Sequence, residues 1–231
     1  MMNARTVAVG ALGIVLLTAA LDGGGVAQYR NFELKADVAT IVALTAAPAS
    51  EVKTIHERPA VIQDLNWRPS RWIAGSSSPS TDAVEQIVFS FYNNQLSRMV
   101  INYGHERTEG MTDADMIAAI SAVYGTPGKR LPGVARIASE VEAESGDPVA
   151  RWGDAEHTIV LYHASSYGRV FRLIVTESAL DDLARKAAIQ AVRLDEQEAP
   201  RREVARQKKA LDDGKIAAEK ARVVNKAIFK P

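Results

Sequence analysis

Two segments carry the alternating apolar and polar pattern of a β-hairpin, and this repetition most limits how the chain can fold. The first segment, FSFYNNQLSRMVINY, covers residues 89–103. The central Asn93-Asn94 pair suits the positive φ angles of a two-residue hairpin turn, which predicts strands over Val84–Tyr92 and Gln95–Tyr103. The second segment, IVLYHASSYGRVFRLIV, covers residues 159–175 and predicts a second hairpin.

Helical patterns precede both hairpins. Residues 38–42 have helical apolar spacing, with Asp37 as N-cap. Residues 48–59, PASEVKTIHERP, begin and end at prolines and are interpreted as a second, short helical turn. Thr112 and Asp115 form a capping-box pattern before another apolar stripe, which Gly125 ends. The last segment, from residue 178 onward, is helical in pattern, with a break or kink expected at Pro200.

A tryptophan-containing strand is also expected before each hairpin, at Trp67 and at Trp152. The order of helix and three strands thus occurs twice, which predicts an α+β protein of two tandem α-β-β-β units, residues 28–110 and 111–178. Six antiparallel strands, in one sheet or two abutting sheets, would pack one face on the helices. Residues 179–231 would form a charged helical extension. Chance similarity of two ordinary hairpins is the alternative.

Residues 1–27 match a secretory signal peptide. Arg5 precedes an apolar run, Val7–Ala20, followed by glycines and small residues, with the best cleavage site after Ala27. The run covers about 21 Å as a helix, short of a hydrocarbon core of about 30 Å. We therefore expect a periplasmic or secreted protein; an uncleaved membrane anchor is the alternative.

Cysteine and charge content narrow the function classes. The chain has no cysteine, so burial alone must hold an exported fold together, and lipid attachment through a cysteine is excluded. Residues 196–231 contain ten Lys or Arg and six Asp or Glu, while residues 1–195 contain 18 and 22. This asymmetry suggests a basic tail on an acidic body or an anionic partner, and it is too mild to indicate nucleic acid.

Uninterrupted alternation in the two hairpins predicts which side chains share a face. Phe89 would lie opposite Arg98, and a four-residue turn at Ser165–Gly168 would place Leu161 opposite Arg172. An arginine among apolar side chains needs a carboxylate if it is buried. Aromatic residues around a central arginine are typical of protein interfaces. The predicted partner-binding face consists of Phe89, Phe91, Arg98, Leu161 and Arg172. The alternative is that the C-terminal helix covers this face through Leu180, Leu183, Ala187, Ala191 and Leu194.

Catalytic and metal-binding patterns are absent from the sequence. There is no Gly-x-Ser-x-Gly, no His-Glu-x-x-His and no phosphate-binding glycine loop. A hydrolase would need His105, Glu106, Glu109 and Asp113 to gather around one cavity. We therefore expect a protein that is not an enzyme and that has no cofactor and no metal site.

The C-terminal extension allows three interpretations. Val204, Leu211, Ala218, Ala221 and Ile228 form a thin apolar stripe at heptad-like spacing. The helix could be solvated and folded loosely on the body, could associate with itself or with a partner protein, or could contact anionic lipid. The residues expected at a lipid or partner contact are Arg201, Arg202, Arg206, Lys208 and Lys209.

The doubled α-β-β-β order with an export signal resembles outer-membrane assembly lipoproteins of the SmpA/BamE type and secreted β-lactamase inhibitor proteins. The likeness covers residues 32–177 and lies in element order alone, so it implies no site residues. It implies a small exported domain that binds another envelope or secreted protein as an assembly or accessory factor. A secreted enzyme inhibitor, with loop 74–82 inserted into its target, is the alternative function. The oligomeric state does not follow from the sequence.

Overall fold

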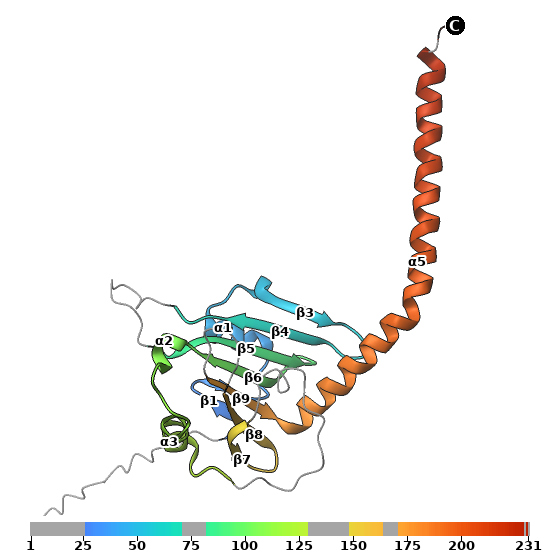
Figure 1. The fold of residues 1–231 in the computed structure, drawn as a ribbon. Coiled ribbons are helices and arrows are strands. Elements are labelled where there is room, and N and C mark those ends of the chain that lie inside the picture. Colours follow the sequence, from blue (N-terminus) through green and yellow to red (C-terminus); the bar gives the residue numbers. More distant parts are fainter. Residues whose placement is uncertain (1–25, 71–81, 129–147, 164–170, 229, 231) are drawn as a thin grey trace, which may run out of the picture.

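The computed structural model describes residues 26–70, 82–128, 148–163, 171–228 and 230 and has an α+β fold (Figure 1). Within these residues, a seven-stranded antiparallel sheet has the strand order β3-β4-β5-β6-β9-β8-β7, and β1 pairs with β2. The strands are β1 (Gln28–Tyr29), β2 (Phe32–Glu33), β3 (Val52–His56), β4 (Ile62–Trp67), β5 (Val84–Tyr92), β6 (Gln95–Tyr103), β7 (Pro148–Gly153), β8 (His157–His163) and β9 (Phe171–Glu177). The helices are α1 (Val38–Thr45), the 3-10 turn η1 (Ala49–Glu51), α2 (His105–Thr108), α3 (Asp113–Tyr124) and α5 (Ser178–Ile228).

Local side-chain chemistry fixes the starts of α1 and α3 as the sequence predicts. The Asp37 carboxylate accepts the backbone N–H of Thr40, 2.7 Å away. Thr112 and Asp115 form a complete capping box, in which each side chain accepts the other residue's backbone N–H. These bonds satisfy amide groups that have no partner inside a helix.

The β5–β6 hairpin has the predicted bounds. Its two turn residues, Asn93 and Asn94, have φ angles of 46° and 67°. Asparagine tolerates these angles, and the resulting turn matches the twist of the two strands.

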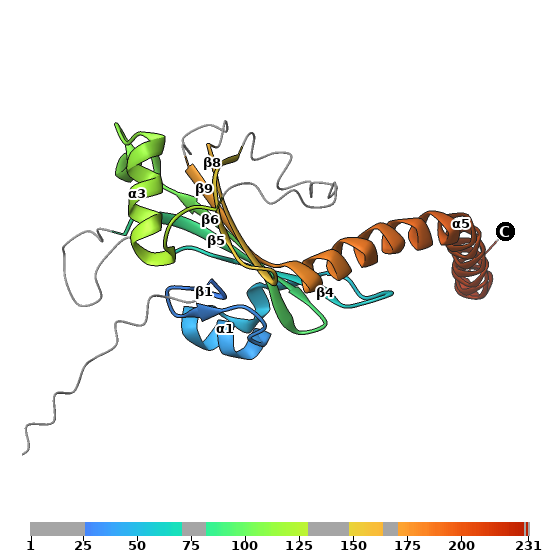
Figure 2. The same ribbon diagram turned by 90° about the horizontal axis from the view of Figure 1, so that it is seen from below.

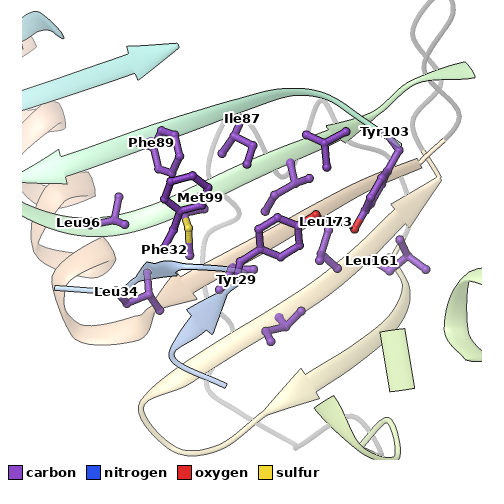
Figure 3. Packing of buried hydrophobic residues seen from close by; sticks show 14 of the residues in the cluster. Tyr29, Phe32, Leu34, Ile87, Phe89, Leu96, Met99, Tyr103, Leu161 and Leu173 are labelled. Atoms are coloured by element: carbon purple, nitrogen blue, oxygen red, sulfur yellow. Dashed lines mark hydrogen bonds between the residues drawn. The ribbon is translucent and has the colours of Figure 1, made fainter. Parts of the chain in front are cut away.

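The main core lies between one face of the sheet and a layer made of α1, α3 and the β1–β2 pair (Figure 2). Ile41 from α1 and Met116 and Ile120 from α3 are buried against this face. Figure 3 shows how the side chains from β1 and β2 pack among those of β5, β6, β8 and β9. Ring contacts strengthen the packing, since Phe32 lies edge-on to both Phe89 and Trp67.

Each strand tryptophan is bound to the helix that precedes its hairpin. The indole N–H of Trp67 donates to the carbonyl oxygen of Thr45, at the end of α1. The indole N–H of Trp152 donates to the hydroxyl of Ser121 in α3. Both indole rings lie on the core side of the sheet, since Trp67 pairs with Ile87 and Trp152 with Ile159.

The helical interpretation of residues 48–59 is wrong after its first turn. Only η1 is helical, and residues 52–56 form the edge strand β3, paired with β4. Val52 pairs with Leu65 and packs against the core, while the following residues face solvent. The sheet therefore has one strand more than the six expected.

Helix α5 begins directly after β9 and contains 51 residues. It leaves the sheet on the side away from α1 and α3 (Figure 2) and extends far from the body, with a bend part-way along (Figure 1). Pro200 lies inside the helix. Because proline removes a helical hydrogen bond and its ring crowds the preceding turn, it accounts for the bend.

Candidate interaction surfaces

The predicted partner-binding face does not exist as one surface. Phe89, Phe91 and Leu161 have no exposed area and belong to the main core. Arg98 and Arg172 lie on the opposite face of the sheet: Arg98 and Asn102 are four residues apart on β6, and Asn102 pairs with Arg172. The two arginines thus share a side with each other and not with the aromatic residues.

A β-bulge causes the error in the first hairpin. Phe91 pairs with Leu96 as expected, but Ser90 pairs with Arg98, so Ser97 is an extra residue on β6. The bulge residue is itself buried, and its hydroxyl donates to the carbonyl of Ser90. One extra residue moves every later side chain of the strand to the other face. Met99 therefore replaces Arg98 opposite Phe89.

The second hairpin is also shifted by one residue from its expected register. Leu161 pairs with Leu173, and Arg172 pairs with Tyr162. The expected turn, Ser165–Gly168, lies outside the described residues. The guanidinium Nε of Arg172 donates to the side-chain oxygen of Asn102 at 2.9 Å.

The part of α5 before Pro200, residues 178–199, is called the root. It covers the face that carries Arg98, as in the alternative interpretation. This helix contacts β5, β6 and β9. Ala187 and Ala191 are buried at 6 % and 3 % exposure, and Leu180 and Leu194 are half-buried. Leu183, which was also expected to cover the face, is instead exposed.

A cluster of buried charges joins the sheet to α5. The Asp181 carboxylate lies 3.5 Å from the Arg98 guanidinium and 3.0 Å from that of Arg185. Its side chain is only 2 % exposed, and that of Arg98 is 16 % exposed. On the sheet, burial raises the pKa of Asp64, opposed by a hydrogen bond from Ser90 and by the charge of Arg98. Arg98 thus finds its carboxylates within its own chain.

A second fixed point lies where β9 becomes α5. Glu177 is 3 % exposed, and its carboxylate accepts the backbone N–H of Leu180 in the first turn of the helix. The ammonium group of Lys35 lies 3.5 Å from the same carboxylate. No loop separates β9 from α5, so the two elements meet at Glu177. The contacts of Glu177 therefore fix the direction in which α5 leaves the sheet.

An exposed ion pair holds α5 again, just before Pro200. Arg58, in the β3–β4 turn, donates two hydrogen bonds to Glu198, at 2.9 and 3.0 Å. Arg202 donates to the same carboxylate from the next helical turn. Hydrogen bonds from Arg58 and then from Arg202 lower the pKa of Glu198 to about 2. No pattern along the chain indicates this contact, which joins residues 140 positions apart.

The part of α5 after Pro200, residues 201–228, is called the arm. Nearly every residue of the arm is exposed, although it carries several apolar side chains. The large ones are Val204, Leu211, Ile216, Val223, Val224 and Ile228, each 54–70 % exposed. At 1.5 Å per residue the arm is about 40 Å long. It presents apolar side chains at a distance from the body.

The basic residues expected at a lipid or partner contact lie on one side of the arm, but ion pairs within the helix use part of their charge. At 100° per residue, Arg201, Arg202, Arg206, Lys208 and Lys209 fall within about 160° around the helix. Arg202 pairs with Asp195 and Glu198, and Arg206 pairs with Glu203. These pairs neutralise part of the charge that would attract anionic headgroups.

The residues named for a hydrolase do not line either of two hollows beside α5. A hollow of about 190 Å³ is lined by Ile55, His56, Glu57, Arg58, Ala191, Leu194, Asp195 and Arg202. A hollow of about 510 Å³ is lined by Lys186, Ile189, Gln190, Arg193, Leu194 and Gln197. Asp113 lies 3.6 Å from His163 at the end of β8 instead. Among the described residues, no group of three or more His, Cys, Asp or Glu side chains is placed to hold a metal ion.

The remaining expectations concern membranes, export and loops. No helix in the described ranges combines the length and apolar character needed to cross a bilayer. The apolar run Val7–Ala20 and most of loop 74–82 lie outside the described residues.

No protein-family model, no curated protein and no solved structure matches this chain.

Proposed function

We propose that this chain is an exported, non-catalytic protein of the cell envelope that binds another protein, and that the arm is its contact surface. The observation that carries the proposal is the contrast between the fixed root of α5 and its exposed end. Three sets of contacts, at Glu177, Asp181 and Glu198, hold the helix before Pro200. A helix held this way places apolar side chains of the arm away from the body, where a partner reaches them.

The doubled architecture forms the finer part of the proposal. We infer that β4-β5-β6 and β7-β8-β9 are equivalent meanders that meet where β6 pairs with β9. The similar bonding of Trp67 and Trp152 to the preceding helices supports this inference. In this view β3 is an addition to the first unit. The second unit ends in α5, so the arm extends from a sheet that has a covered core face.

Export is proposed from the sequence of residues 1–27. Cleavage after Ala27 would leave Gln28 at the N-terminus, where β1 starts. The carbonyl of Gln28 accepts a hydrogen bond from the Tyr124 hydroxyl, and this contact would survive the cut. Mass spectrometry of the protein from the extracellular or periplasmic fraction tests the site. A retained residue 1 would exclude cleavage.

A photoreactive amino acid tests the arm as the contact surface. Placed at Leu211 in living cells, it should give adducts of higher mass on illumination. Val123 is the matched control, because it is a half-exposed apolar residue on α3 of the body. Equal adducts at both positions, or none at position 211, would overturn the proposal.

A further inference from the structure

Every seventh residue of the arm from Val204 lies along one side of the helix. These positions hold Val204, Leu211, Ala218 and Asn225, and the positions three residues after each hold Gln207, Gly214, Ala221 and Ile228. Together they have the a and d spacing of a two-stranded coiled coil, and they are called the seam. Three of its apolar residues, Val204, Leu211 and Ile228, are 66, 66 and 70 % exposed.

The two sides that border the seam differ in charge. On one side, the e positions hold only cations, namely Lys208, Lys215 and Arg222. On the other side, the g positions hold one anion and three apolar residues, namely Glu203, Ala210, Ala217 and Val224. In coiled coils these flanks select both partner and orientation.

We propose that the arm pairs with the arm of a second copy of this chain as a parallel, two-stranded coiled coil. The inference rests on the proposed function and names the partner of the same surface. An antiparallel pair would bring the cationic flank of one copy against the cationic flank of the other. A parallel pair brings it against the flank that starts with Glu203 and continues with apolar residues, so no like charges meet.

The polar and small residues of the seam agree with the parallel arrangement. In a parallel pair each a position faces its own counterpart, so the amide side chain of Asn225 meets the same amide and can hydrogen-bond to it. In an antiparallel pair each a position faces a d position instead, so the two Asn225 amides would not meet. Gly214, Ala218 and Ala221 lie in the middle of the seam, where their small size lets two helices approach closely.

Ionic strength separates this pairing from attachment to lipid. Residues 201–228 carry nine Lys or Arg and four Asp or Glu, a net charge of +5 for each arm. Two such arms repel each other, and salt screens that repulsion, so pairing should strengthen as salt is added. Binding of the same arm to an anionic membrane would weaken under the same change.

Single cysteines provide the decisive experiment, because the chain has none of its own. Ala218→Cys places a thiol in the seam, where parallel pairing brings it next to its counterpart at disulfide distance. Ala205→Cys is the matched control, about 140° around the helix. Under mild oxidation of the exported protein, Ala218→Cys should give a disulfide-linked dimer and Ala205→Cys should not. Equal linkage in both variants, or none in either, would overturn the inference.

Sedimentation equilibrium of the exported, cysteine-free protein gives a second measurement. We expect a dimer mass that is lost in Leu211→Lys, which places a charge in the seam. Ile216→Lys, on the other side of the arm, should keep the dimer mass. A monomer at all concentrations, together with photo-adducts between Leu211 and a different protein, would exclude self-pairing and leave the proposed function standing. Absence of every arm adduct would remove the proposed function itself.

Discussion

The two halves of α5 belong to one continuous helix, yet different interactions maintain them. Before Pro200 the helix is held by tertiary contacts: Ala187 and Ala191 are buried against the sheet, and Asp181 lies between two arginines. In the arm, the ion pairs among the described residues lie within the helix itself. Examples are the pairs between Arg206 and Glu203 and between Arg222 and Glu219. Exposed pairs of this kind contribute a few tenths of a kcal/mol each.

This difference indicates which half serves the fold and which is available for other work. The arm has about 28 residues and a glycine near its centre, and glycine disfavours the helix. Without tertiary packing, only its length and its internal ion pairs stabilise it. Its apolar side chains add nothing to the body, because they contact none of it. Substitutions in α5 before Pro200 should therefore change the free energy of unfolding of the body. Substitutions after Pro200 should instead change the association of the arm with its partner.

The largest effect is expected at the buried charge cluster. Asp181→Ala leaves the guanidinium groups of Arg98 and Arg185 close together without the carboxylate between them, and should destabilise the body by about 3–5 kcal/mol. Urea unfolding followed by tryptophan fluorescence measures this change, since Trp67 and Trp152 both pack in the core.

Asp182→Ala is the matched control for that experiment. Its side chain is 49 % exposed and pairs with the same Arg185 at the surface. Its loss should cost less than about 1 kcal/mol. If both variants lost the same stability, the cluster would not be what fixes the root of α5.

The charge cluster also illustrates how far sequence patterns reach. The need of Arg98 for a carboxylate follows from its chemistry, and Asp181 meets it. The face on which Arg98 lies does not follow, because the bulge at Ser97 interrupts the alternation. Both faces of strand β6 carry apolar residues, such as Met99 on one and Val100 on the other. The pattern of hydrophobic residues therefore could not reveal the shift.

Local signals predicted elements well because their causes are local. The two-asparagine turn and the capping box of Thr112 fixed the β5–β6 hairpin and the start of α3. Strand β3 was missed because the prolines that flank it, Pro48 and Pro59, resemble helix boundaries and an edge strand has little alternation to recognise. The pairing of Arg58 with Glu198 depends on how a turn and a helix meet in space.

A second prediction places the same substitution in both halves of the helix. Ala191→Leu inserts a large side chain where alanine is 3 % exposed, so overpacking should destabilise the body by about 1–3 kcal/mol. Ala205→Leu adds the same atoms to an exposed position of the arm and should leave the urea midpoint unchanged. A shift of similar size in both variants would mean that the arm contributes to the stability of the body after all.

The smallest effect is expected from the exposed pair before Pro200, and it depends on pH. The folded protein holds the pKa of Glu198 at about 2, below the ordinary 4.5. A lowered carboxyl pKa contributes stability above the ordinary value, and this contribution disappears as the pH falls from about 4.5 toward 2. Glu198→Gln should therefore be slightly less stable than the parent near neutral pH, with the gap closing on acidification.

Glu203→Gln provides the comparison for that titration. Hydrogen bonds from Arg206 and Gln207 also lower the pKa of Glu203, but both partners belong to the arm. Because this carboxylate does not join the arm to the body, its replacement should leave the urea midpoint of the body unchanged at every pH. A gap for Glu203→Gln that closed in acid as it does for Glu198→Gln would show that pairs within the arm stabilise the body. The division of α5 at Pro200 would then be wrong, since both halves would support the fold.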